Sequence, residues 1–156
     1  MFHNNGQQAI FVKKVSMPIE YVYNTKFKLP NETKVSFWLN QVVVSENYVL
    51  GDLTYAFFND EDLKEINIKF LNHDFYTDVI SFNDTRNQTI GGNIAISVDR
   101  VVENAKLFGV SFDDELRRVM VHGLLHFVGF NDKTKTDKLI MTQTENLKIQ
   151  MFHVEQ

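Results

Sequence analysis

His122 and His126 stand four positions apart and have the spacing that metal chemistry requires. On an α-helix, four residues advance the backbone by about 6 Å and rotate it by about 400°, so both imidazoles project from one face. Two ligands of one tetrahedral metal ion need that arrangement. Gly129 can then end the helix and turn the chain back, which brings a carboxylate oxygen of Asp132 within reach of the same ion. We therefore predict that His122, His126 and Asp132 bind one metal ion.

The complete pattern, His-x-x-x-His-x-x-Gly-x-x-Asp, has the ligand spacing of an extended zinc motif whose last position usually holds a third histidine. Three protein ligands leave a fourth position for water, and zinc lowers the pKa of that water to about 7. We expect one zinc ion per chain, with Mn²⁺ or another divalent ion as the alternative because Asp132 is anionic. Asn131 and Asp132 could instead form a simple turn.

Gly123 occupies the position at which zinc proteases of the His-Glu-x-x-His type carry their general base. Glycine can neither accept nor donate a proton through a side chain, so peptide hydrolysis by that route is disfavoured. A zinc peptidase or amidohydrolase remains an alternative function. A non-catalytic protein with a structural metal is another, and four protein ligands without a bound water would distinguish it.

The elements that must position these residues follow from periodicity, caps and turn residues. Ser111 is expected to cap the helix that carries the histidines, and Gly129 to end it. Helices are predicted over about residues 31–44, 61–71, 97–108, 111–128 and 136–152, and strands over residues 10–15, 51–58, 78–82 and 91–97. Because strands and helices do not alternate strictly, we predict an α+β fold. Its small mixed sheet would pack against helices, with the metal-binding helix near the C-terminus.

Composition limits the class of protein. The 156 residues are expected to form a single metal-dependent hydrolase domain, residues 1–156. The absence of cysteine excludes disulfides, Cys-ligated zinc and a thiol nucleophile. No apolar stretch approaches the roughly 20 residues that cross a bilayer, and the polar N-terminus does not resemble a signal peptide. We expect a cytoplasmic protein with no membrane partner.

The net charge of −4 does not suggest strong non-specific binding of nucleic acid. A local basic groove would still be compatible with that charge. The basic residues that could form one, or could simply be solvated, are Lys13, Lys14, Lys64, Lys69, Arg117, Arg118, Lys133, Lys135 and Lys138.

Four sequence blocks resemble the YbeY family of bacterial endoribonucleases, also called rRNA maturation factors. The similarity extends from about Gly51 to Leu147, and its most specific part is the family's His-Gly-x-Leu-His-x-x-Gly signature. The corresponding blocks are Glu115–Phe130, Asn67 with Thr77–Phe82, Gly92–Ile96, and Met141 with Glu145. Agreement of several blocks in the right order makes a chance match improbable.

The resemblance implies a single α+β domain with a catalytic zinc on a helix. It also implies cleavage of single-stranded RNA in rRNA maturation and ribosome quality control. The expected partners are single-stranded RNA or rRNA, and the ribosomal small subunit or its assembly proteins. In the alternative with a structural metal, the chain would be a non-catalytic ribosome assembly factor. The metal would polarise the phosphate or activate a water, while the RNA's own 2′-hydroxyl is an alternative nucleophile.

Three positions depart from the family pattern: Asp132 replaces the third histidine, Leu71 replaces an arginine, and Asn93 replaces an aspartate. The loop that lacks the arginine contains His73 and Asp74. Both are candidate catalytic residues, with His73 as a base or a phosphate contact. Alternatively His73 is simply exposed to solvent, and Asp74 and Asp78 cap turns.

Aromatic residues near these loops could provide stacking surfaces for unpaired bases, although each could equally belong to the core. They are Phe75, Tyr76, Phe82 and Phe130. Glu115 could orient a ligand histidine, or it could interact with the dipole of its own helix.

Overall fold

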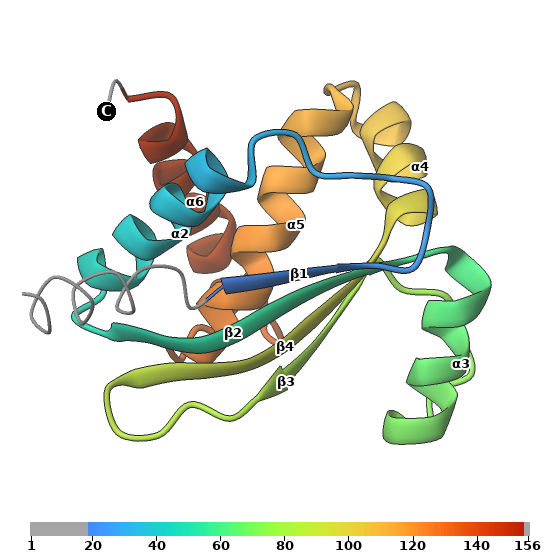
Figure 1. Ribbon diagram of the computed structural model, residues 1–156, viewed down its shortest axis with the longest axis horizontal. Coiled ribbons are helices and arrows are strands. Elements are labelled where there is room, and N and C mark those ends of the chain that lie inside the picture. The colour runs from blue at the N-terminus through green and yellow to red at the C-terminus, as the bar shows by residue number, and fades with distance from the viewer. Residues whose placement is uncertain (1–18, 155–156) are drawn as a thin grey trace, which may run out of the picture.

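The computed structural model describes residues 19–154, which form an α+β fold as predicted (Figure 1). The predicted strand at residues 10–15 lies outside the described residues. Within the described range, no helix has both the length and the apolar character needed to cross a membrane. In chain order the elements are β1 (Ile19–Tyr23), α2 (Glu32–Ser45), β2 (Val49–Phe58), α3 (Asp60–Leu71), β3 (Val79–Asn83), β4 (Thr89–Ser97), α4 (Val98–Phe108), α5 (Phe112–Phe127) and α6 (Lys135–Phe152).

The four strands form one mixed sheet in the order β1-β2-β4-β3. β1 pairs in parallel with β2, and β2 in parallel with β4. β3 is antiparallel to β4 and forms one edge of the sheet. The mixed sheet was predicted, but β1 at the opposite edge was not.

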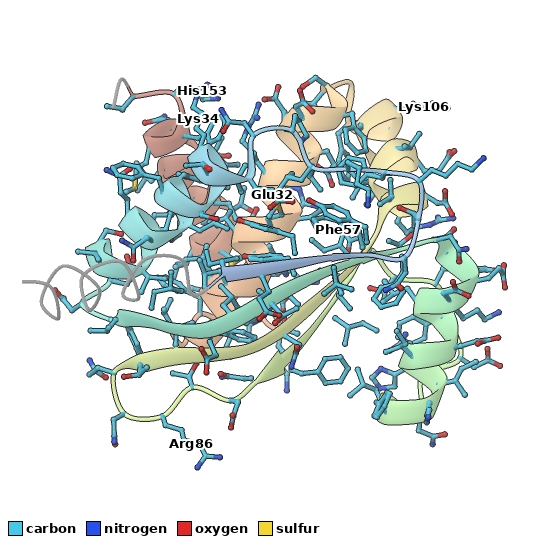
Figure 2. All side chains as sticks on the ribbon, in the orientation of Figure 1. Glu32, Lys34, Phe57, Arg86, Lys106 and His153 are labelled. Carbon is cyan, nitrogen blue, oxygen red and sulfur yellow. The ribbon has the colours of Figure 1, made fainter. Side chains whose placement is uncertain are left out.

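The two faces of the sheet are covered differently (Figure 1). Helices α2, α5 and α6 lie over one face, while α3 lies on the other side. Side chains from alternate positions of β2, including Phe57, point into the layer between the sheet and the helices (Figure 2) and belong to the main core. Leu63 of α3 packs with Ile80 and Ala95 in a second, smaller core.

Helix α5 has the ends that the sequence predicted. The Ser111 side chain accepts a hydrogen bond from the Asp114 amide at the N-terminus. At the other end, Gly129 adopts a φ of 101°, a conformation that residues with a side chain rarely adopt. The chain reverses there and leads into α6.

Gly123 brings α5 unusually close to the sheet. A Cβ atom at this position would lie 2.9 Å from Ile94 Cγ2 and 3.1 Å from Ser81 Oγ. Only a residue without a side chain fits this gap without displacing those atoms. This close contact sets how far the turn of α5 that carries His122 lies from the sheet.

Candidate metal centre and its cleft

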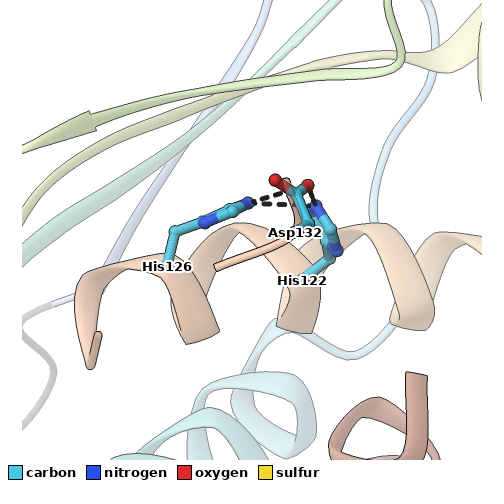
Figure 3. A group of neighbouring side chains, drawn as sticks. All are labelled: His122, His126 and Asp132. Carbon is cyan, nitrogen blue, oxygen red and sulfur yellow. Dashed lines mark hydrogen bonds and ion pairs between the residues drawn. The ribbon is translucent and has the colours of Figure 1, made fainter. Parts of the chain in front are cut away.

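The structure brings together the three predicted metal-binding side chains (Figure 3). His122 and His126 project from α5, and Asp132 projects from the segment between α5 and α6. The two Nε2 atoms lie 3.2 Å apart. Asp132 Oδ2 lies 3.3 Å from Nε2 of His122 and 3.4 Å from Nε2 of His126. The three donor atoms therefore form a nearly equilateral triangle.

This triangle fits a tetrahedral metal ion. With zinc bonds to nitrogen and oxygen of about 2.0–2.2 Å, two donors at corners of a tetrahedron are about 3.3–3.6 Å apart. The observed separations of 3.2–3.4 Å agree with that value to about 0.1 Å. Among the described residues the group contains three such donors, so a tetrahedral ion bound by them would have one corner without a protein ligand.

A backbone contact fixes the orientation of His126. Its Nδ1 lies 3.0 Å from the carbonyl oxygen of Phe130, which can only accept a hydrogen bond. Nδ1 therefore carries the proton, and Nε2 keeps a lone pair that faces the other two donors. The backbone amide of Phe130 in turn donates to the carbonyl of Leu125, at 3.0 Å. The turn that follows α5 thus orients the imidazole ring of His126.

A buried carboxylate holds the other histidine. Glu145 of α6 is 4% exposed, and its Oε2 lies 2.5 Å from His122 Nδ1. A carboxylate on the distal nitrogen of a ligand histidine fixes the ring and increases its basicity. Burial alone would lower the pKa of His122, but the hydrogen bond and the charges of Glu145 and Asp132 raise it above its ordinary value of 6.5. Metal binding at Nε2 must therefore displace a proton in acidic solution.

Arg118 links this pair to the rest of the site. Its Nη1 lies 3.7 Å from Glu145, and its Nε and Nη2 donate to the two oxygens of Glu115 at 2.8 and 2.6 Å. Nη2 also lies 3.4 Å from Asp78 Oδ2. The hydrogen bond with Glu115 is the main cause of a raised pKa for Arg118, so the guanidinium stays charged. Glu115, predicted as a candidate to orient a histidine, contacts Arg118 instead, and Glu145 makes the histidine contact.

The three donors open into a cleft of about 630 Å³, which is within the usual range for ligand sites. The lining residues are Asn67, Leu71, His73, Phe75, Thr77, Asp78, Val79, Ile80, Ser81, Asn83, His122, His126, Phe127 and Asp132. Among the described residues, no lysine or arginine lines the cleft. A basic groove, left open by the sequence, is therefore not found at this cleft.

The two predicted catalytic residues of the loop after α3 occupy different places. His73 lines the cleft. Asp74 does not; its side chain is 78% exposed and lies 3.6 Å from Lys64 Nζ. Asp78 lines the cleft and accepts a hydrogen bond from Asn104 Nδ2 at 3.3 Å. His73 therefore lies at the cleft and Asp74 lies outside it, and the catalytic role of each stays a prediction.

Glu145 is the functional residue that sequence reasoning did not assign. It matched the family's C-terminal helix, but no role was inferred for it. The buried positions of α6 are Met141, Glu145 and Lys148. A glutamate on the buried stripe of a helix requires a partner, and that was the available signal.

Comparison with known proteins supports the resemblance seen in the sequence. A family model described as Endoribonuclease YbeY matches residues 20–153. Endoribonuclease YbeY of Flavobacterium johnsoniae is 49% identical over 138 residues, which cover 88% of this chain and 99% of that protein. Endoribonuclease YbeY of Bacteroides thetaiotaomicron is 39% identical over 126 residues, covering 80% of this chain and 92% of that protein.

The fold also matches a solved structure, the solution structure of a protein from Thermotoga maritima. The TM-score is 0.62 at 22% sequence identity, and the match covers 86% of this chain and 88% of that one. At this identity the likeness concerns the fold alone.

Proposed function

The chain belongs to the YbeY endoribonuclease family, and from that premise we propose that it is a zinc-dependent endoribonuclease for single-stranded RNA. The whole chain would act as one hydrolase domain in the cytoplasm. The observation that carries the proposal is the triangle of His122, His126 and Asp132 at the cleft, with donor atoms at tetrahedral spacing. Ribosomal RNA as the substrate, and the small subunit or its assembly proteins as partners, are proposed from the family resemblance.

The chain's own residues would hold and orient the reacting groups. Zinc held by these residues would be a Lewis acid, able to polarise a phosphoryl oxygen and to lower the pKa of a bound water. Glu145 and the Phe130 carbonyl keep the two imidazoles in the tautomer that directs Nε2 to the metal. We assign the role of base or phosphate contact to His73, because its ring reaches the cleft, and assign no catalytic role to Asp74.

The alternative of a His-Glu-x-x-His peptidase is disfavoured by Gly123. A side chain at that position would meet Ile94 and Ser81 on the sheet, so a general base does not fit there. The alternative of a structural metal is disfavoured by the number of donors. Three protein donors beside a substrate-sized cleft suit a hydrolytic site better than a closed structural one.

Replacement of Asp132 tests the metal site and the activity together. We expect about one zinc per wild-type chain by elemental analysis, and clearly weaker retention in Asp132→Ala. Cleavage of a labelled single-stranded RNA should fall more than about 100-fold in the variant, and chelator should abolish it in the wild type. Asp113→Ala is the matched control, because Asp113 is an exposed residue in the first turn of α5.

Casein assayed in parallel separates the alternatives. Chelator-sensitive cleavage of casein without cleavage of RNA would refute the proposal and favour a peptidase. Zinc retained with neither substrate cut would also refute it, in favour of an assembly protein with a structural metal.

A further inference from the structure

Two stacked rings lie in the loop after α3, and this loop lines the same cleft as the metal donors. The rings of His73 and Phe75 have centroids 5.1 Å apart and planes inclined by 19°. Both residues line the cleft, and Phe75 is 53% exposed. Because Phe75 shares this cleft with the candidate metal donors, its exposed ring offers an apolar face to a ligand there. We call residues 72–77 the aromatic wall.

The aromatic wall is held in place at its base. Asn67 of α3 is 1% exposed, and its Nδ2 donates a hydrogen bond of 3.1 Å to the Phe75 carbonyl. The Asn67 carbonyl accepts a hydrogen bond of 3.2 Å from the His73 amide. Since one buried residue ties down both ring-bearing positions, the exposure of Phe75 belongs to a defined conformation of the loop.

The neighbouring Tyr76 has a different role, although it is 43% exposed. Its hydroxyl donates to Glu61, and the cations of Lys64 and Arg100 lie 4.6 and 5.5 Å from the ring centre. Tyr76 does not line the cleft. Its ring and hydroxyl contact Glu61, Lys64 and Arg100, so Phe75 is the aromatic residue of this pair that lines the cleft.

The remaining aromatic candidates from the sequence are occupied elsewhere. Phe82 packs partly buried against the small core, and Phe130 against the main core. At the position where the family pattern has an arginine, Leu71 gives the cleft an apolar side chain. Among the described lining residues no lysine or arginine offers a cation to a phosphate, so stacking would be a further source of affinity beside the bound metal.

We propose that His73 and Phe75 form a stacking platform for one unpaired nucleobase, which places the adjoining phosphate toward the metal donors. This rests on the proposed function as an RNA endonuclease. Stacking on an aromatic ring is open only to bases that are free of a duplex, so the platform would give the site its preference for single strands. The face of the His73 ring that Phe75 does not cover would serve stacking, while its edge nitrogens remain able to contact phosphate.

Binding of a fluorescent ten-nucleotide oligoadenylate to the zinc-loaded protein tests the platform. Phe75→Ala should lower the affinity about 5- to 150-fold, the range reported for loss of one base–aromatic contact. Phe75→Trp should retain wild-type affinity. The slope of log affinity against log salt should not change in Phe75→Ala, because that slope counts phosphate contacts rather than stacked bases. Phe37→Ala is the control, since Phe37 is a half-exposed phenylalanine on α2.

The outcomes separate the platform from the proposed function. Wild-type affinity in Phe75→Ala would overturn the platform, and RNA cleavage by the wild type would still support the proposed function. A flatter salt slope in Phe75→Ala would also overturn it. Binding that depends on Phe75, in a wild type that retains zinc but does not cleave RNA, would support the platform and refute the proposed function.

Discussion

The metal-binding side of the cleft and the aromatic wall differ in how their side chains are held. On the metal-binding side, His122 is fixed by a buried glutamate from α6, and His126 by a backbone carbonyl. On the aromatic wall, the rings of His73 and Phe75 support each other and remain exposed to solvent. Metal binding tolerates only small errors in ligand position, whereas stacking accepts any base that lies flat on a ring.

The supporting contacts differ in the same way. Behind the metal-binding side lies a largely buried network that joins Glu145, Arg118 and Glu115 across α5 and α6. The aromatic wall is attached to the domain by the Asn67 side chain and by the partly exposed side chains of Lys64 and Arg100, which lie over the Tyr76 ring. The metal-binding side therefore holds its side chains in defined positions, whereas the aromatic wall can accept ligands in a wider range of positions. Replacing supports on each side should therefore have unequal effects.

The largest effect is expected for Glu145→Gln on the metal-binding side. Glutamine keeps the size of the side chain but removes the charge that orients His122, so zinc affinity should fall about 10- to 100-fold. Competition with a chromogenic chelator measures this affinity. Glu103→Gln on α4 is the control, because Glu103 forms only an exposed pair with Lys106. Equal zinc affinity in wild type and Glu145→Gln would show that the buried carboxylate does not support the metal site.

The contacts that could be predicted from sequence are the local ones. The spacing of His122, His126 and Asp132 lies within one helix and its following turn, so helical geometry alone brought the residues together. The same holds for the caps Ser111 and Asn31, each of which accepts a hydrogen bond from the amide three residues later. The α+β class, the helices that flank the site, and the three predicted strands that correspond to β2, β3 and β4 followed from periodicity of this kind.

What depended on distant contacts could not be predicted. Glu145 lies 23 positions from His122, and only the packing of α6 on α5 brings the two together. Strand β1 is five residues long, and its pairing with β2 joins residues 34 positions apart in sequence, as in Ile19 with Leu53. Val42 and Val43 are β-branched, a type of residue that favours strands. They are helical here, and both are buried in the main core.

A smaller effect is expected for Gly123→Ala, which tests how closely the metal-binding side must approach the sheet. The added methyl group would meet side-chain atoms of Ile94 and Ser81 at 2.9 and 3.1 Å, so either the helix or these side chains must shift. We expect a loss of about 1–2 kcal/mol in the free energy of unfolding, the usual cost of overpacking a core. Urea denaturation measures it. Gln143→Ala on the exposed face of α6 should change the stability by less than about 0.5 kcal/mol.

Unchanged stability in Gly123→Ala would mean that the helix and sheet can move apart freely. The metal-binding side would then lack the rigidity that distinguishes it from the aromatic wall. Zinc affinity measured on the same variant extends the test, because a displaced helical turn also displaces His122.

The smallest effect concerns the ionic attachment of the aromatic wall. Asp60 accepts hydrogen bonds from Arg100 Nη2 at 2.7 Å and from Ser97 Oγ at 2.7 Å, and Arg100 lies over the ring of Tyr76. Burial alone would raise the pKa of the Asp60 carboxyl, but the hydrogen bonds from Arg100 and Ser97 lower it below its ordinary value of 3.8. Asp60→Asn should therefore cost about 1 kcal/mol or less at neutral pH.

The sign of its pH dependence follows from that lowered pKa. A carboxyl that ionises more readily in the folded chain than in the unfolded chain contributes its full stability above the ordinary pKa. The contribution is lost as the pH falls below 3.8 and through the folded-state pKa. The difference in unfolding free energy between wild type and Asp60→Asn should accordingly shrink in acid, as urea denaturation from pH 7 to pH 3 would show. A difference that grows in acid would mean that Asp60 is not stabilised by Arg100.

The same variant separates the two sides of the cleft. Because Glu145 and Gly123 lie outside the cluster of Asp60, Arg100 and Tyr76, zinc affinity at pH 7 should be the same in Asp60→Asn as in the wild type.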